Sequence, residues 1–286
     1  MRYIFLPVIW FFRTSSPVWY FFYRQLDSAF RLFDDRRLQI IDHLRLIPPA
    51  RYRTGGQSAL SEYGYSAGVM AAYIAEHLNV DNPQVLDLGC GTGKLVNAVW
   101  PLLGQGGHYY GLDISRKAID FDRRWYPGDR CTFIHADLYN AHYHPGGQPL
   151  AEYHIPMDDH TLDLVVAFSL FTHLNQPDST HYFREMARLL KPGGVAVLTI
   201  FLMDERYQRE LHMGTRWAFD RMIDGQPEWY WSSWFTVPER QIAVTFAGLQ
   251  TLMGEDFTLE HVYPGWWTGH SAATLQDTLV LRRNNN

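Results

Sequence analysis

Short apolar runs alternate with longer helical repeats through the middle of the chain. Apolar runs typical of buried strands occupy residues 85–88, 108–112, 132–135, 162–168 and 194–201. Apolar positions with the three-to-four-residue period of an amphipathic helix occupy 94–103, 116–125 and 178–190. Strands that alternate with helices are typical of βαβ units in a parallel sheet. Two later apolar runs, 257–263 and 278–281, are expected to add an antiparallel hairpin.

The residues before this sheet are expected to be largely helical. Apolar residues recur at helical intervals over 24–46, until Pro48 and Pro49 end the pattern. A second helical repeat, over 69–78, leads into the first strand. We therefore predict an aromatic-rich helical N-terminal extension over 1–50 and one domain over 51–286. That domain carries insertions near 139–153 and 204–256.

The first 23 residues are crowded with aromatic side chains. The apolar stretch is interrupted at 13–17, so neither half approaches the ~20 residues needed to span a bilayer. No small-residue cleavage site of a secretory signal follows it. Two interpretations stay open: a cap packed on the domain or on a partner chain, and a peripheral anchor at the membrane interface, where Trp and Tyr are favoured.

Composition narrows the class of protein. The 286 residues include 25 Lys+Arg and 30 Asp+Glu, a formal charge of −5, which offers no field to gather phosphates. Nucleic acid is therefore not expected as a partner. Only Cys90 and Cys131 are present, too few for a disulfide framework, which fits a reducing cytoplasm or the inner face of its membrane. The oligomeric state is not predicted.

A glycine-rich loop follows the first predicted strand. Gly89, Gly91 and Gly93, with Cys90 and Thr92 between them, let the backbone turn tightly and approach a ligand without Cβ obstruction. Dinucleotide oxidoreductases use a related turn that receives a pyrophosphate. Asp87, at the mouth of this loop, disfavours a pyrophosphate and favours a ligand with an ammonium and a sulfonium centre.

Two more carboxylates end the next predicted strands. Asp113, followed by Ile114, lies about 20 residues beyond the glycine loop, where a carboxylate accepts ribose hydroxyls. Asp137 can accept from an adenine amino group while Leu138 lies against the ring. The alternatives are an N-cap role for Asp113 and a turn role for Asp137.

These stretches together resemble the class I S-adenosylmethionine-dependent methyltransferases. The motif VLDLGCGTG at 85–93 resembles the first motif of that family, and GLDIS at 111–115 resembles the second. The approach to the fourth strand at 155–165 and the turn at 189–194 are also similar. The resemblance implies an α/β fold with a Rossmann-like, seven-stranded, mostly parallel sheet and helices on both faces. It also implies S-adenosylmethionine as the cofactor.

The residues after the fourth strand are expected to lie between cofactor and acceptor. Phe168 and Ser169 are predicted to contact the cofactor. His173 is the candidate catalytic residue, because imidazole is suited to removing a hydroxyl proton near neutral pH. Its alternative role is to line the pocket or to form a hydrogen bond with a backbone group.

The acceptor is predicted from aromatic residues near the C-terminus. Trp266, Trp267 and His270 are candidate substrate-binding residues, since aromatic rings can stack on sugars, although core packing is the commoner role of Trp. This region loosely resembles methyltransferases encoded with bacterial surface-glycan enzymes. The leading hypothesis is therefore O-methylation of a sugar or glycan hydroxyl. The alternatives are a small aromatic or lipid-like acceptor, and a scaffold that binds cofactor without turnover.

No metal site is predicted. His142, His144 and His154 fall in an expected loop with loose spacing, which does not match the regular ligand spacing of known zinc sites.

Overall fold

The computed structural model describes residue 25 and residues 46–53 and 59–285. The aromatic segment, its predicted membrane contact and nearly all of the predicted helix over 24–46 lie outside these residues. Among the residues described, no helix is long and apolar enough to cross a membrane.

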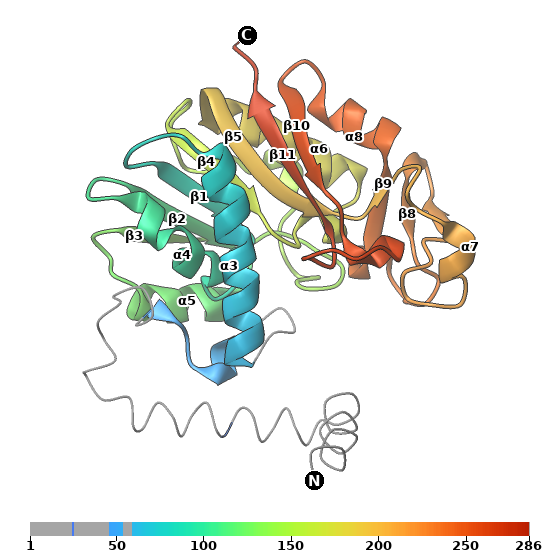
Figure 1. Ribbon diagram of the computed structural model, residues 1–286, viewed down its shortest axis with the longest axis horizontal. Coiled ribbons are helices and arrows are strands. Elements are labelled where there is room, and N and C mark those ends of the chain that lie inside the picture. Colours follow the sequence, from blue (N-terminus) through green and yellow to red (C-terminus); the bar gives the residue numbers. More distant parts are fainter. Residues whose placement is uncertain (1–24, 26–45, 54–58, 286) are drawn as a thin grey trace.

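A seven-stranded sheet forms the centre of the molecule, with the strand order β10-β11-β5-β4-β1-β2-β3 (Figure 1). Its strands are β1 (Gln84–Leu88), β2 (His108–Asp113), β3 (Cys131–His135), β4 (Leu162–Ala167), β5 (Leu190–Ile200), β10 (Phe257–Tyr263) and β11 (Asp277–Arg283). Strands β1 to β5 pair in parallel, whereas β11 pairs antiparallel with both β5 and β10. The predicted fold class is confirmed.

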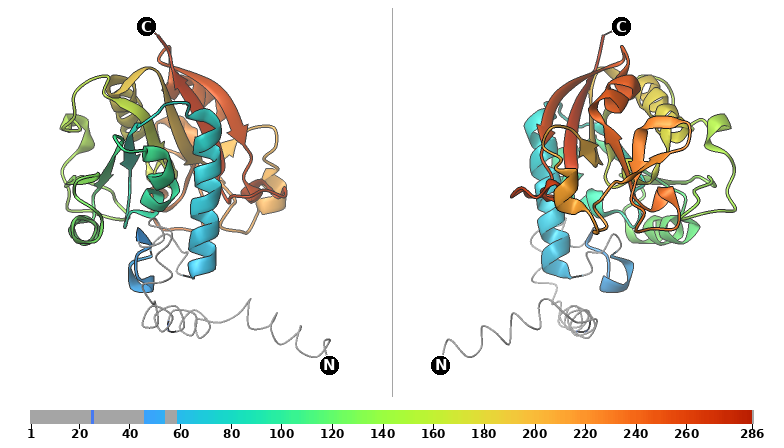
Figure 2. Two further views of the ribbon diagram at one scale, coloured as in Figure 1. Left: turned by 60° about the vertical axis from the view of Figure 1, so that its left-hand side comes forward. Right: turned by 90° about the vertical axis from the view of Figure 1, so that its right-hand side faces the viewer.

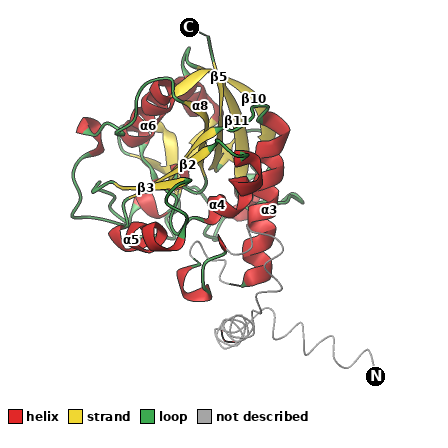
Figure 3. Ribbon diagram, turned by 90° about the vertical axis from the view of Figure 1, so that its left-hand side faces the viewer, coloured by secondary structure: helices red, strands yellow, loops and turns green. Residues whose placement is uncertain are grey.

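Helices cover both faces of this sheet (Figures 2 and 3). They are α3 (Leu60–His77), α4 (Lys94–Val99), α5 (Arg116–Trp125), α6 (Gln176–Leu189) and α8 (Phe246–Met253). A short α7 (Arg209–His212) lies apart from this sheet, in the insertion over 204–256. Side-chain caps explain where three of them begin: Ser115, Asn175 and Thr245 each accept a hydrogen bond from the backbone three residues on. The predicted helix over 94–103 ends as a 3-10 turn, η4 (Trp100–Leu103).

Alternating strand residues build a separate core on each face. Leu86 and Leu88 of β1 pack with α6 and α8, while Val85 packs with α3, α4 and α5. Strand β4 repeats the pattern, because Val165 and Leu164 belong to opposite cores. The whole of β4 is buried, as a central parallel strand requires.

The insertion over 204–256, together with the two residues before it, forms a sheet that the sequence pattern did not predict. A second sheet has the order β6-β9-β8-β7, formed by β6 (Leu202–Met203), β7 (Arg221–Ile223), β8 (Gln226–Trp231) and β9 (Ile242–Thr245). The indole of Trp229 is fully buried beside α8, so this insertion shares the core of α6 and α8. It directly continues β5 at the carboxyl edge of the main sheet.

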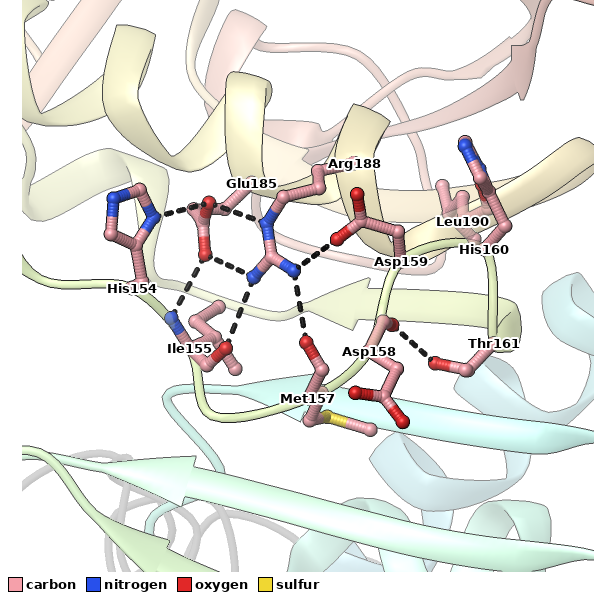
Figure 4. A network of polar contacts seen from close by, with 10 residues as sticks. All are labelled: His154, Ile155, Met157, Asp158, Asp159, His160, Thr161, Glu185, Arg188 and Leu190. Atoms are coloured by element: carbon pink, nitrogen blue, oxygen red, sulfur yellow. Dashed lines mark hydrogen bonds and ion pairs between the residues drawn. The ribbon is translucent and has the colours of Figure 1, made fainter.

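A polar network holds the segment before β4 (Figure 4). Arg188 donates to both carboxylate oxygens of Glu185, to Asp159 and to the backbone oxygens of Ile155 and Met157. Glu185 is only 4% exposed, and the hydrogen bonds from Arg188 contribute to lowering its pKa to about 2 despite its burial. The network lies at the amino end of β4, opposite the glycine loop, and its donors are satisfied internally.

Candidate functional site

The glycine loop leaves the carboxyl end of β1 in a left-handed conformation. Gly89, Gly91 and Gly93 have φ of 74°, 55° and 71°, a region that side chains disfavour. A Cβ on Gly93 would lie 2.5 Å from the ring of Tyr126, whose hydroxyl contacts the backbone oxygens of Thr92 and Gly93. The loop is therefore fixed in a tight turn at the carboxyl end of β1, and its glycines cannot be replaced without strain or crowding.

Asp87 points into the fold beneath this loop. Its carboxylate accepts a 2.6 Å hydrogen bond from the Tyr109 hydroxyl and is 4% exposed. Burial raises the pKa of Asp87 to about 7, against the opposing effect of the Tyr109 hydrogen bond. Because it is buried, the Asp87 carboxylate does not offer an open surface for direct contact with a ligand. It can act on a ligand by supporting the loop above it and through its electrostatic field.

Asp113, at the end of β2, joins the glycine loop to the next turn. One carboxylate oxygen accepts from the Gly91 amide at 2.8 Å and the other from the Ser115 amide at 2.7 Å. Burial raises the pKa of Asp113, and these two hydrogen bonds oppose that shift. Each oxygen keeps a further lone pair, so the carboxylate can still accept two ribose hydroxyls. Ser115 caps α5, as expected.

Asp137 and Leu138 follow β3 at the same edge. The Asp137 carboxylate is exposed and lies 2.7 Å from Nε2 of His144, a residue of the predicted insertion over 139–153. Leu138 is buried at 4% exposure. The carboxylate predicted to meet adenine thus already has a partner within the chain.

The imidazole of His173 is held on both sides. Its Nδ1 lies 2.9 Å from the backbone oxygen of Glu239, and its Nε2 lies 3.2 Å from the Tyr143 hydroxyl. Burial lowers the pKa of His173 to about 4, and the neighbouring His142 and Arg240 act in the same direction. The ring is therefore neutral at physiological pH and a weak base.

Ser169, a predicted cofactor contact, joins two residues that the sequence did not indicate, Thr199 and Gln276, where β4, β5 and β11 meet. The Ser169 amide donates to the Thr199 hydroxyl, and both hydroxyls donate to Oε1 of Gln276, at 3.1 Å from Ser169 and 2.6 Å from Thr199. The shorter distance is that of an O–H···O bond, which assigns this atom as the amide oxygen. Ser169 has φ of 57°, a strained value often found at functional sites.

The three predicted acceptor residues lie in different environments. Trp266 is 44% exposed and packs edge-on against Trp217, with 6.0 Å between ring centroids. His270 is exposed. Trp267 is fully buried, and its indole N–H donates to the buried Asp277 at 2.6 Å. The structure therefore places Trp267 in the core rather than on a surface that an acceptor reaches.

Within the part of the chain that the structure describes, no group of three or more His, Cys, Asp or Glu side chains is arranged to hold a metal ion. His142 lies 3.2 Å from Arg240, and His154 lies 3.3 Å from Glu185. These histidines take part in separate contacts.

Comparison with known proteins identifies a methyltransferase domain within the chain. Residues 85–194 match the family model of a methyltransferase domain. A tRNA N(3)-cytidine methyltransferase of Danio rerio is 27% identical over 66% of this chain and 52% of its own length. A demethylmenaquinone methyltransferase of Halalkalibacterium halodurans is 32% identical over 43% of this chain and 45% of its own length. The chain thus spans about half the length of these curated relatives.

The fold comparison agrees with this match. Magnesium protoporphyrin IX methyltransferase of Synechocystis PCC 6803, solved with bound S-adenosylhomocysteine, superposes with a TM-score of 0.51. The superposition covers 85% of this chain and 94% of that one at 16% identity, so it supports the fold alone. Taken with the sheet order and the glycine loop at its carboxyl edge, these similarities support a class I methyltransferase domain over residues 85–194, with S-adenosylmethionine as its cofactor.

Proposed function

We propose that the chain transfers the methyl group of S-adenosylmethionine to a hydroxyl of a sugar or glycan. The oxygen–methyl bond forms as the sulfonium–methyl bond breaks, which leaves S-adenosylhomocysteine, and the hydroxyl proton passes to solvent. One observation carries the choice of acceptor: the fixed carboxamide of Gln276 lies on the same C-terminal segment as the exposed Trp266. An amide N–H that is oriented by Ser169 and Thr199 suits a sugar oxygen. An indole face suits the apolar side of a sugar ring.

The cofactor site of this proposal uses the residues at the carboxyl edge. Asp87 and the glycine loop serve the methionine portion, with Phe168 and Ser169 lining it. The Asp113 carboxylate accepts the ribose hydroxyls, and the Asp137 oxygen that is not bonded to His144 accepts from adenine. Leu138, at 4% exposure, belongs to the core beneath this turn. When bound, the cofactor supplies an electrophilic methyl group on a sulfonium.

The acceptor side lies between the Gln276 carboxamide and the aromatic surface. Thr199 and Ser169 occupy Oε1 of Gln276, so its Nε2 is the donor left to meet an acceptor oxygen. The aromatic surface consists of Trp266 and its neighbour Trp217. The guanidinium of Arg216 lies 4.3 Å from the centre of the Trp217 ring and adds a positive charge to this surface. The weak basicity of His173 favours a positioning role over proton removal.

A lipid-like or small aromatic acceptor is the second candidate. The insertion over 204–256 exposes Leu211 by 68%, Met213 by 58% and Trp234 by 63%. Apolar side chains in such number favour contact with an apolar ligand or surface. One relative is named for a quinone substrate. A scaffold without turnover remains the third candidate, and the exclusion of nucleic acid stays a prediction.

Radiolabelled S-adenosylmethionine offered with separate acceptors tests these candidates. Methyl glucopyranoside and methyl rhamnopyranoside probe the sugar, and menadiol probes the lipid-like alternative. We expect label in a methyl ether of a glycoside. Label in menadiol alone would reject the sugar acceptor, and tight S-adenosylhomocysteine binding without transfer to any probe would favour the scaffold.

A further inference from the structure

The insertion over 139–153 contacts both ends of the cofactor edge. In the sheet order, β3 and β4 are separated by β1 and β2, a span of about 14 Å at ordinary strand spacing. The ends of β1 and β2 carry the glycine loop and Asp113. A segment that touches the residues after β3 and those after β4 therefore spans the edge at which β1 and β2 also end.

The first attachment is to the end of β3. His144 lies 2.7 Å from the Asp137 carboxylate, and the Gln148 amide donates to the Asp137 backbone oxygen at 2.9 Å. Gly147 packs so tightly that a Cβ there would lie 2.3 Å from the Leu138 backbone. The insertion is thereby clamped to the residues predicted to hold adenine.

The second attachment is to the turn after β4. The side-chain Nδ2 of Asn140 donates to the His173 backbone oxygen at 2.9 Å, and the Tyr143 hydroxyl lies 3.2 Å from Nε2 of His173. Asn140 also fixes the tip, because its Oδ1 accepts from the His142 and Tyr143 amides. The insertion is therefore held at two places, at the end of β3 and at the turn after β4.

We propose that this insertion roofs the cofactor site and that Tyr143 is a cofactor-binding residue whose ring contacts the adenosine half of S-adenosylmethionine. Tyr143 remains 58% exposed, so its ring has a free surface for a ligand. It also lies within electrostatic reach of the ribose carboxylate: burial raises the pKa of Tyr143, Arg240 opposes the shift, and the charge of Asp113 raises it further. This inference rests on the proposed cofactor site but not on the identity of the acceptor.

Calorimetric titration of the full chain with S-adenosylhomocysteine tests whether Tyr143 and the insertion over 139–153 contact the cofactor. Tyr143→Ala removes the ring and is expected to weaken binding roughly three- to tenfold, the usual worth of an aromatic contact. Tyr143→Phe keeps the ring and should bind within about twofold of the wild type. Val80→Ala is the control, since Val80 is 47% exposed in the loop before β1, at the opposite edge of the sheet from the glycine loop. It should leave binding unchanged.

Hydrogen exchange of the wild-type chain gives a second readout that needs no variant. Amides of residues 139–144 should gain protection when S-adenosylhomocysteine binds. Equal binding by Tyr143→Ala and the wild type, or no gain in protection, would overturn the roof while leaving the proposed function intact. Weakened binding without transfer to glycosides would uphold the roof and reject the sugar acceptor. A wild type that binds no S-adenosylhomocysteine would reject both.

Discussion

The Nδ1 atom of His173 lies 2.9 Å from the backbone oxygen of Glu239, and this contact fixes the state of the ring. A carbonyl oxygen only accepts, so Nδ1 carries the hydrogen and Nε2 carries the lone pair. The Tyr143 hydroxyl therefore donates to Nε2. The imidazole is held in one neutral tautomer by groups from two separate insertions.

This arrangement predicts a pH dependence of stability. The pKa of His173 is about 4 in the folded chain and about 6.5 when unfolded. The unfolded chain binds more protons between these values, so stability falls as the pH decreases from about 6.5 towards 4. Urea unfolding should show His173→Gln losing less stability than the wild type across this window. An identical loss in both chains would contradict the burial argument.

Histidine nitrogen NMR gives a direct check on the same ring. Wild-type His173 should remain the Nδ1–H tautomer from about pH 5 to 8. Tyr143→Phe should perturb the Nε2 resonance without protonating the ring. A mixed tautomer population would show that the Glu239 contact does not hold in solution.

Substitution of two glycines with the same backbone conformation distinguishes the cost of backbone strain from the cost of side-chain crowding. Gly93 and Gly193 have φ of 71° and 77°, but a Cβ meets the Tyr126 ring only at Gly93. Gly193→Ala should cost about 1–2 kcal/mol for the left-handed backbone alone. Gly93→Ala should cost about 1–3 kcal/mol more, because the packed ring must move. Equal midpoints in urea would refute the crowding at Gly93.

The main sheet was predictable because its pattern is local. Each βα unit carries a compact apolar run, and α5 begins where Ser115 predicts it. The second sheet was missed because β7 and β6 are three and two residues long. Such short strands show no measurable period, and pairing across a long insertion leaves no local signal.

The cofactor residues were named from motifs, whereas their partners depend on tertiary contacts. Asp113 follows a strand, a pattern readable in sequence. The Gln276 cluster joins residues from three separated strand ends, with Ser169 and Gln276 107 positions apart. The burial of Trp267 likewise depends on Asp277 and the packed insertion. Composition alone does not distinguish a core Trp from an exposed one such as Trp266.

The Arg188 network gives a prediction about stability. Arg188→Met leaves the buried Glu185 carboxylate without its partner and should cost about 3–5 kcal/mol. Arg282→Met is the matched control, because its pair with Glu260 is about one-third exposed on each side. That change should cost about 1 kcal/mol or less. If both variants lost a similar free energy of unfolding at neutral pH, the buried ion pair would not be more stabilising than the exposed one.

The same network predicts a pH dependence of stability. Since the pKa of Glu185 is about 2, the contribution of this network should be lost as the pH falls from about 4.5 towards 2.

Asp113→Ala offers the sharpest test of the cofactor site. The substitution removes the acceptors for ribose and the anchor of the Gly91 amide, and charged hydrogen bonds of this kind imply a roughly 10- to 150-fold loss of affinity for S-adenosylhomocysteine. His173→Ala should spare that affinity, and so should Asp129→Ala, which removes an exposed carboxylate elsewhere. Calorimetry on chains shown to be folded by circular dichroism measures all three. Equal losses in Asp113→Ala and His173→Ala would contradict the division between cofactor and acceptor residues, because the two side chains would then act on the same ligand.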